Sequence, residues 1–132
     1  MYLLDTNICI SLMRNQYPKM TDKILSMDPS LLMISSITIF ELEYGATKSQ
    51  QKERTQAQLA MFLSAFTILP FDAGDAIAAG RIRGELAKKG TPIGPYDLQI
   101  AAQGLSRKLT VVTHNIDEFS RVQDLQVEDW VQ

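Results

Sequence analysis

The chain has 132 residues, of which 45% are hydrophobic and 21% charged, as is usual for a soluble protein of about one domain. Its single cysteine, Cys9, excludes an internal disulfide framework. No apolar run approaches the ~18 residues of a membrane helix, and the first residues lack a signal-peptide pattern. We therefore expect a cytoplasmic protein. The net charge of −2 argues mildly against a nucleic-acid partner, and the placement of the charges has to decide that question.

Short apolar runs alternate with helical patterns along the chain. The first half predicts a strand at 1–4, a helix to about 13, a second helix to about 27, a strand at 31–34 and a helix from 37 to about 47. The second half predicts a helix around 57–66, a strand at 67–71, a helix from 72 to about 89 and a separate helix that ends at about 106. It then predicts a strand at 109–113, a short helix and a last apolar stretch near 125–127. This alternation predicts one α/β domain over residues 1–132, an α/β/α sandwich around a mainly parallel sheet.

Two of the predicted helices carry features that bear on packing. The helix from 37 to about 47 is apolar nearly all round, which is typical of a buried helix. The helix from 72 to about 89 opens with a capping-box pattern, Asp72 with Asp75, and ends at Gly90. It also carries a row of small residues that suits close packing against a neighbour, namely Ala76, Gly80 and Gly84.

Acidic and polar residues lie where parallel sheets form their sites, at or near the carboxyl ends of the strands. Asp5 follows the first strand and is either the N-cap of the next helix or a carboxylate that faces a cleft. Glu41 lies in the helix after the second strand, where Glu43 is an equal candidate on the pattern alone. His114 and Asn115 end the fourth strand, and a histidine in such a place is more often a turn residue than a catalyst.

Asp97 lies in the first turn of a helix that we expect to begin at Pro95, where the helix dipole favours a carboxylate. It also shares a helical face with apolar residues at the spacing i, i+3, i+4, i+7 and i+8. Those residues are Ile100, Ala101, Gly104 and Leu105. A capping carboxylate has no need to point toward the core, so the pattern favours a carboxylate that reaches into a cleft.

Several carboxylates in one cleft would repel one another, and a divalent cation relieves that repulsion. Oxygen ligands from Asp and Glu suit Mg²⁺, or Mn²⁺ in its place, and these ions also accept phosphate oxygens. Cys9 and His114 lie far apart in the sequence and do not make a zinc site. The chain has neither a nucleophile-elbow motif nor a glycine-rich phosphate loop.

A set of short segments runs in order over nearly the whole chain. The segments are MYLLDTN (1–7), SSIT (35–38), ELEYGA (41–46), GPYD (94–97), IA (100–101), VTHN (112–115), EF (118–119) and VEDW (127–130). In this set the chain resembles the PIN-domain ribonucleases, and specifically the VapC toxins of bacterial toxin–antitoxin pairs. The resemblance implies a PIN fold and Mg²⁺-dependent endonucleolytic cleavage of RNA.

The resemblance also assigns roles to particular acids. It places the family's invariant carboxylates on Asp5, Glu41 and Asp97 and so decides for Glu41 over Glu43. Asp5 and Asp97 are then the main metal ligands. Glu41 holds metal-bound water or orients the attacking water.

Beyond these three acids, the site is expected to draw on the turn after the fourth strand. Many family members carry a fourth acid there, but this chain has Asn115, which can still bind a metal-bound water, with Asp117 as a further contributor. Thr6 and Thr113 resemble supporting hydroxyls of the same cleft.

Basic residues are clustered in spite of the negative net charge, and each cluster is either a solvated helix surface or part of a rim that contacts RNA phosphates. The residues singled out for substrate binding are Arg81, Arg83 and Lys88. The other clustered cations are Lys48, Lys52, Arg54, Lys89, Arg107 and Lys108.

The resemblance further implies partners: a homodimer, a VapB antitoxin that covers the active site, an RNA substrate, and DNA only through the antitoxin. Transfer RNA, including its initiator form, is the candidate substrate, and no membrane partner is expected. The small-residue row and the apolar helix from 37 are compatible with such surfaces, but internal packing is the favoured explanation. The alternatives are a non-catalytic PIN-like module, supported by Asn115, and a more distant phospho-accepting regulator.

Overall fold

Five parallel strands form the central sheet of the computed structural model, which describes residues 1–131. They are β1 (Tyr2–Leu4), β2 (Leu32–Ser35), β3 (Thr67–Leu69), β4 (Thr110–Val112) and β5 (Val127–Glu128), in the spatial order β3-β2-β1-β4-β5. β1 is the central strand, and its Leu3 and Leu4 are completely buried, as its continuous apolar sequence predicts. The predicted α/β fold with a parallel sheet is confirmed.

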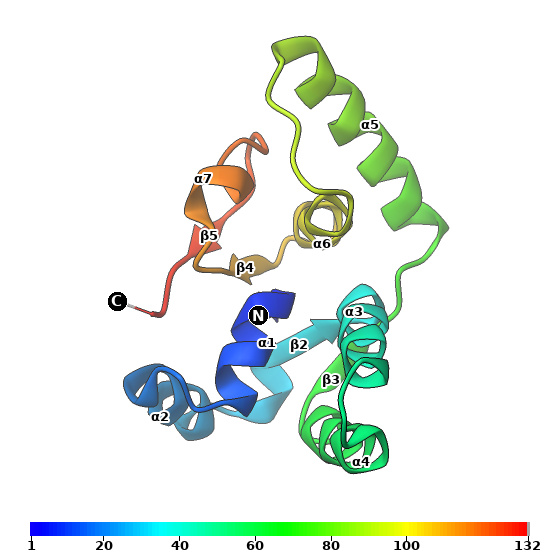
Figure 1. Ribbon diagram of the computed structural model, residues 1–132. Coiled ribbons are helices and arrows are strands. Elements are labelled where there is room, and N and C mark those ends of the chain that lie inside the picture. The colour runs from blue at the N-terminus through cyan, green and yellow to red at the C-terminus, as the bar shows by residue number, and fades with distance from the viewer. Residues whose placement is uncertain (132) are drawn as a thin grey trace.

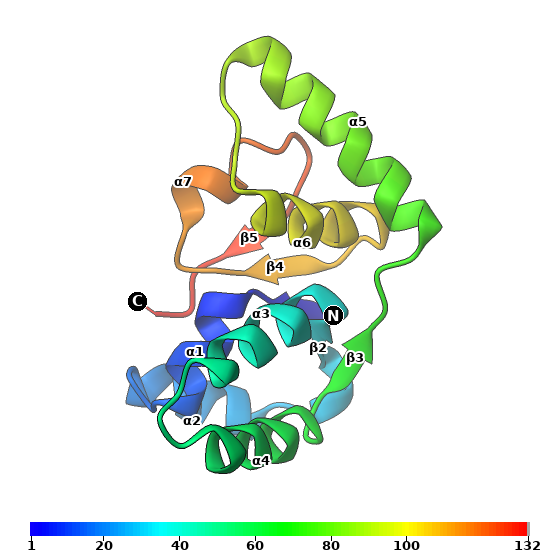
Figure 2. The same cartoon turned by 45° about the vertical axis from the view of Figure 1, so that its right-hand side comes forward.

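Helices connect the strands and cover both faces of the sheet (Figures 1 and 2). They are α1 (Thr6–Met13), α2 (Pro18–Ser26), α3 (Ser36–Thr47), α4 (Lys52–Leu63), α5 (Ala73–Lys89), α6 (Pro95–Ser106) and α7 (Ile116–Phe119), with a 3-10 turn at Pro29–Leu31. The layer of α5, α6 and α7 packs on Leu3 and Val111, whereas α1, α2 and α4 lie on the other face, that of Leu4 and Val112. Among the described residues, no helix combines the length and the hydrophobicity that crossing a membrane requires.

Helix α3 lies at the boundary between the two layers. Its Ile37 packs with the layer of α5 and α6, and its Leu42 packs with the opposite one. Phe40 and Tyr44 project outward and are 55% and 57% exposed. The prediction that this helix is buried is therefore wrong. Apolar residues on every side of a helix do not determine which of its faces pack against neighbouring elements.

The row of small residues on α5 faces solvent. Ala76, Gly80 and Gly84 are exposed, and a methyl group added at either glycine would meet no atom within 4 Å. Internal packing is therefore the wrong explanation for this row. The helix packs through its other face, where the buried side chains are Ala79, Ile82 and Leu86.

A partly buried ion pair between Asp75 and Arg107 joins the start of α5 to the end of α6. Asp75 is 2% exposed and accepts hydrogen bonds from Arg107 Nε at 3.3 Å and Nη2 at 2.9 Å. Burial raises the pKa of Asp75, but hydrogen bonds from Arg107, the Asp72 backbone, Ser106 and Gln103 outweigh it and lower the pKa to about 2. Arg107 is thus committed to the fold rather than to a basic rim.

Candidate active site

The carboxyl ends of β1, β2 and β4 lie at one edge of the sheet. The strands are parallel, and their register sets Leu4 of β1 beside Ile34 of β2 and Val112 of β4. Asp5 follows β1 directly, and its backbone N–H donates to the Val112 carbonyl at 3.0 Å. Parallel sheets form their binding sites at this edge, so the residues that follow these strands define the candidate active site.

Asp5 has both of the roles that the sequence left open. It caps α1, because its Oδ1 accepts a hydrogen bond from the Ile8 N–H at 2.8 Å, and it is also a buried carboxylate, 2% exposed, at the edge of the sheet. Burial raises its pKa to about 6, against the opposing effect of hydrogen bonds from the Thr113 side chain and the Ile8 backbone. The charge of Glu41 is a smaller cause of this rise, and that of His114 acts against it.

Glu41 is positioned by a chain of hydroxyl groups. Thr6 Oγ1 donates to Glu41 Oε1 at 2.7 Å and lies 2.9 Å from Thr38 Oγ1. Because the single hydrogen of the Thr6 hydroxyl is used on Glu41, Thr38 is the donor in the second bond. Glu43 is an exposed residue of the same helix and takes no part in this chain of bonds.

Asp97 lies in the first turn of α6 and is half buried. The helix has no side-chain cap, so Asp97 is not there to cap it. The pKa of Asp97 is raised to about 7, chiefly by burial and then by a hydrogen bond with Glu118 and the charges of Asp5, Glu118 and Glu41. The structure therefore brings Asp97 close to Asp5 and Glu41.

The turn after β4 contributes a carboxylate that the sequence analysis did not assign. Asn115 donates from Nδ2 to Glu118 Oε2 at 2.8 Å, and its backbone N–H donates to Thr113 Oγ1 at 2.9 Å. Glu118 in turn lies against Asp97. A signal for Glu118 was present, because it follows Asn115 by three residues and a helical turn places such residues on one face.

The other polar residues near β4 point elsewhere. Asp117 is exposed on α7, and no hydrogen bond or ion pair joins it to the acids within residues 1–131. His114 Nδ1 lies 3.0 Å from Asp129 Oδ2, and the histidine side chain is 53% exposed.

The donor set fits a hard divalent cation held partly through water. All the converging groups are carboxylates, hydroxyls or amides. The charge of Glu41 raises the pKa of Asp5, and the charges of Asp5, Glu41 and Glu118 raise that of Asp97, against only a small opposing effect of His114 on Asp5. In the part of the chain that the structure describes, no group of three His, Cys, Asp or Glu side chains forms a ready-made metal site. Magnesium commonly binds through one or two carboxylates and keeps several waters, so Asp5 and Asp97 suffice as direct ligands.

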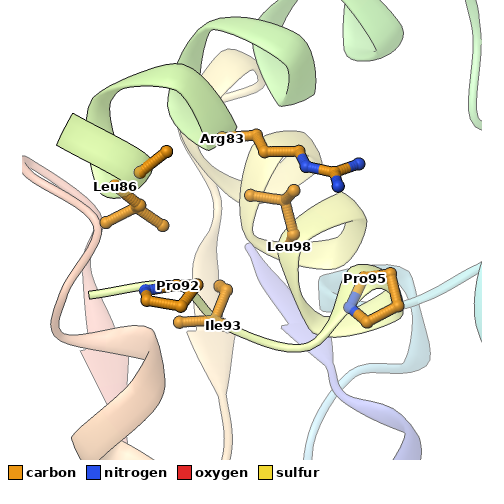
Figure 3. A pocket seen from close by; sticks show the side chains of 7 residues that line it. Arg83, Leu86, Pro92, Ile93, Pro95 and Leu98 are labelled. Carbon is orange, nitrogen blue, oxygen red and sulfur yellow. The ribbon is translucent and has the colours of Figure 1, made fainter. Parts of the chain in front are cut away.

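The three basic residues predicted to bind substrate lie exposed on α5. Arg83 lines a cavity of about 320 Å³ between α5 and the loop before α6. Figure 3 shows its side chain lying over Leu98, with Pro92 and Ile93 on the loop and Pro95 at the start of α6. Because Pro95 is the first residue of α6, this cavity lies close to the turn that carries Asp97. Within residues 1–131, no hydrogen bond or ion pair joins Arg81 or Lys88 to the acids.

Comparison with known proteins identifies the family. The model of the PIN domain matches residues 2–125 of this chain. The chain belongs to the PIN-domain family. It is 46% identical to the tRNA(fMet)-specific endonuclease VapC of Salmonella typhimurium over 98% of this chain and 97% of that protein. It is 40% identical to ribonuclease VapC2 of Rickettsia felis, again over 98% and 97% of the two chains.

Solved structures place this PIN-domain protein among the VapC proteins as well. A DNA-bound VapBC complex from Salmonella typhimurium matches with a TM-score of 0.92 and 46% identity, over 98% of this chain and 97% of that one. VapBC-1 from nontypeable Haemophilus influenzae matches with a TM-score of 0.90 and 35% identity, over 99% and 98%. The predictions of the VapC branch, of the PIN fold and of a nuclease are confirmed.

Proposed function

We propose that this PIN-domain protein is the toxin of a toxin–antitoxin pair and cleaves RNA as a metal-dependent endoribonuclease. The observation that carries the proposal is the convergence of four carboxylates at one edge of the sheet, where burial and, after it, the neighbouring carboxylates raise the pKa values of Asp5 and Asp97. The other two carboxylates are Glu41 and Glu118. The names of the relatives, an endonuclease and a ribonuclease, support the same activity.

Asp5 and Asp97 are proposed to hold Mg²⁺, or Mn²⁺ in its place. When bound, the ion lowers the pKa of a water molecule and offsets the charge that the phosphodiester gains in the transition state. The neighbouring hydroxyls and amide then have a positioning role. Thr113 holds Asp5, Thr6 holds Glu41 and Asn115 holds Glu118, so each acid keeps its place despite the repulsion of the others.

Glu41 is proposed to orient the attacking water and to accept its proton. Thr6 bonds Oε1 of Glu41, which fixes the carboxylate group in the cleft and leaves its second oxygen for this task. Asp97, with a pKa of about 7, holds or releases a proton close to neutral pH when no cation lies beside it.

The proposed substrate is transfer RNA, with the initiator form as the first candidate, because the most similar relatives include tRNA(fMet)-specific endonucleases. Arg81, Arg83 and Lys88 are proposed to contact its phosphates from α5. Arg83 supports this best, because its cavity ends at Pro95, next to the turn that carries Asp97. Contacts of this kind would make binding strongly dependent on salt.

The proposed partners follow from the VapBC complexes among the similar structures. We propose that a VapB-type antitoxin covers the acidic site, that the toxin forms a homodimer, and that DNA is reached only through the antitoxin. The exposed small residues of α5 and the aromatic face of α3 leave room for such contacts.

The test is cleavage of a total transfer-RNA pool by the purified protein, with Mg²⁺, with excess chelator, and with the substitution Asp97→Asn. Discrete fragments that disappear in both controls are expected. Glu41→Gln should also lose cleavage, whereas the matched change Glu43→Gln on the exposed side of α3 should keep it. The same fragments from wild type and Asp97→Asn would contradict the assigned site.

The alternative is a non-catalytic PIN-like module, which Asn115 alone favours. The contact of Glu118 with Asp97 weakens that alternative, because it supplies a fourth acid where the sequence pattern lacks one. Binding of Mg²⁺ by folded, antitoxin-free protein without any loss of RNA would support it.

A further inference from the structure

A polar cavity opens beside the acidic site, between α1 and the turn after β4. Its volume is about 440 Å³, within the range of pockets that hold small molecules. Its wall consists of residues of α1, of the segment that joins α1 to α2, and of the turn after β4, and we call it the α1 pocket. Within residues 1–131, none of the residues that line it comes from α3 or α5. Partner contacts on the exposed faces of those two helices therefore leave the pocket open.

Hydrogen bonds connect the wall of the α1 pocket to the acids. Ile8 lines the pocket, and its backbone N–H donates to Asp5 Oδ1 at 2.8 Å. Asn115 also lines it, and its Nδ2 donates to Glu118 Oε2 at 2.8 Å. Glu118 is in turn hydrogen-bonded with Asp97. The pocket and the acidic site thus share a wall, and a polymer with one phosphate at the acids has a neighbouring unit within reach of the pocket.

Two aromatic rings form part of that wall. Tyr17 and His114 lie 6.3 Å apart between ring centroids and are tilted by 52°. Tyr17 packs on the layer of α1, α2 and α4, and the imidazole of His114 is oriented by Asp129, whose Oδ2 lies 3.0 Å from Nδ1. Rings that are held in this way before a ligand binds offer flat faces on which a base can stack.

Two side-chain amides, those of Asn7 and Gln16, also line the α1 pocket. Each amide carries both donors and an acceptor, and so matches the mixed polar edges of the bases. The Gln16 amide bonds Ser11 Oγ and Tyr17 Oη at 3.3 Å each, beyond the usual range of strong hydrogen bonds. Within residues 1–131, no hydrogen bond engages the side chain of Asn7. Both amides are therefore available to a ligand.

Arg14 brings a positive charge to the α1 pocket. Among the residues of 1–131 that line the pocket, it is the only Lys or Arg, and none is acidic. Its side chain is exposed and forms no ion pair in this part of the chain. Arg14 also lines a neighbouring cavity of about 430 Å³ that includes Glu41. The guanidinium thus borders both the pocket and the side of the site that carries Glu41, where it can contact an RNA phosphate.

We propose that the α1 pocket binds one nucleotide of the RNA next to the bond that is cut. The base stacks on the rings of Tyr17 and His114. The amides of Asn7 and Gln16 bond its polar edge, and Arg14 contacts a phosphate of the same strand. The inference rests on the proposed function, because it takes the RNA that is cut as the occupant.

The lining of the α1 pocket favours a nucleotide over a side chain of a protein partner. An apolar side chain would leave the guanidinium and the two amides without partners, which is costly when water is excluded. An acidic side chain would pair with Arg14 but would leave the rings uncovered. A nucleotide supplies a flat face, a polar edge and a phosphate together, and so matches all three kinds of group.

The experiment measures the binding of fluorescein-labelled initiator transfer RNA by fluorescence anisotropy, in the Asp97→Asn background so that the RNA stays intact. Tyr17→Leu removes the ring but keeps an apolar side chain. It should weaken binding about tenfold and leave the slope of log Kd against log salt unchanged, because stacking involves no counterion. Tyr17→Phe restores the ring and should regain the affinity that Tyr17→Leu loses.

A second variant is needed because Tyr17 also packs on the core, so its loss can weaken the fold. Arg14→Gln changes an exposed side chain and should reduce the slope of log Kd against log salt by about one. Lys108→Gln is the matched control, because Lys108 is an exposed cation just before β4, at the opposite end of the strands from the acids. It should leave the slope unchanged.

Wild-type affinity and an unchanged salt slope in both Tyr17→Leu and Arg14→Gln would overturn the inference. So would a change from dimer to monomer in sedimentation with the RNA affinity unchanged, because the pocket would then join two copies of the chain. Base recognition is tested in the cleaving protein. Gln16→Ala should broaden the choice of nucleotide at the cut, read by sequencing the fragment ends, whereas an unchanged choice would remove Gln16 from the pocket's role.

Cleavage by the wild-type protein keeps this inference distinct from the proposed function. If wild type cuts transfer RNA and the variants of Tyr17 and Arg14 bind it as the background does, only the nucleotide pocket fails. If wild type neither binds nor cuts RNA, the proposed function fails, and the nucleotide pocket fails with it.

Discussion

Glu118 supplies a carboxylate beside Asn115, where the sequence pattern offers only an amide. Because Glu118 contacts Asp97 and is held by Asn115, its removal should impair catalysis although it lies outside the three acids of the sequence motif. Glu118→Gln is expected to lower kcat for RNA cleavage by about a hundredfold, the low end of what a positioned acid or base contributes. The measurement is single-turnover cleavage with saturating Mg²⁺.

Asp117→Asn provides the comparison for Glu118→Gln. Asp117 is exposed on the same short helix, and within residues 1–131 no hydrogen bond or ion pair joins its carboxylate to the acids. The expected change in kcat is less than about twofold. A larger effect for Asp117→Asn than for Glu118→Gln would reverse the assignment that the structure suggests.

The sequence identified part of the acidic site for physical reasons. Asp97 was predictable, because a charged residue on the apolar face of a helix needs a cleft or a partner. Glu41 could not be separated from Glu43 by periodicity, because α3 is apolar all round and the contact with Thr6 joins residues 35 positions apart. The spacing of Glu118 from Asn115 indicates that these two residues lie together. The contact of Glu118 with Asp97 was not predictable from the sequence, because it depends on how α6 and α7 pack.

At the scale of the elements, α6 packs closely on β4 through Gly104. A methyl group at this position would lie 2.6 Å from Val111 Cγ2 and 3.1 Å from Leu125 Cδ1. The valine side chain is stiff and completely buried, so it has little room to move. Gly104→Ala is therefore expected to lower the free energy of unfolding by about 2 kcal/mol, measured in urea.

Gly84→Ala is the matched control for Gly104→Ala. It lies in the interior of α5, where an added methyl group would meet nothing within 4 Å. Alanine has the higher helix propensity, so this change should raise the free energy of unfolding by up to about 1 kcal/mol. Equal destabilisation by both changes would show that the face of α5 with small residues is covered in solution.

The strands and helices were predictable from the sequence where the spacing of apolar residues indicates which side is buried. The run at residues 1–4 became β1, and the capping box at Asp72 and Asp75 begins α5 as expected. The direction of α3's exposed face was not predictable, because it depends on which neighbours the helix meets after folding. The orientation of the small-residue row on α5 is of the same kind, since small residues suit both a close contact and an open surface.

At the scale of the whole molecule, the parallel topology assembles a concentrated negative charge from distant parts of the chain. β1 and β4 pair directly although their paired residues are 108 positions apart in the sequence, so Asp5 and the turn after β4 meet at one edge of the sheet. Folding therefore brings together charges that are far apart in the unfolded chain. The free-energy cost of bringing these charges together should depend on the pH and on whether a metal ion is bound.

The metal-free protein should lose stability as the pH rises from about 4 to about 7. The pKa of Asp5 is raised from 3.8 to about 6 and that of Asp97 to about 7, so the folded state binds protons that the unfolded state has already released over this range. Asp5 alone would lower the free energy of unfolding by about 3 kcal/mol on completing this change. Mg²⁺ should restore stability at pH 7.5 and have little effect at pH 5, where the acids carry protons.

Urea unfolding of dialysed protein at pH 5 and pH 7.5, with and without Mg²⁺, measures this dependence. Asp5→Asn is the informative variant, because an asparagine can still cap α1 but carries no charge. It should flatten the pH dependence of the metal-free protein and reduce the effect of Mg²⁺ at pH 7.5. If the metal-free wild type were as stable at pH 7.5 as at pH 5, and Mg²⁺ changed neither value, the clustered acids would not be the uncompensated charges that the proposed metal site requires.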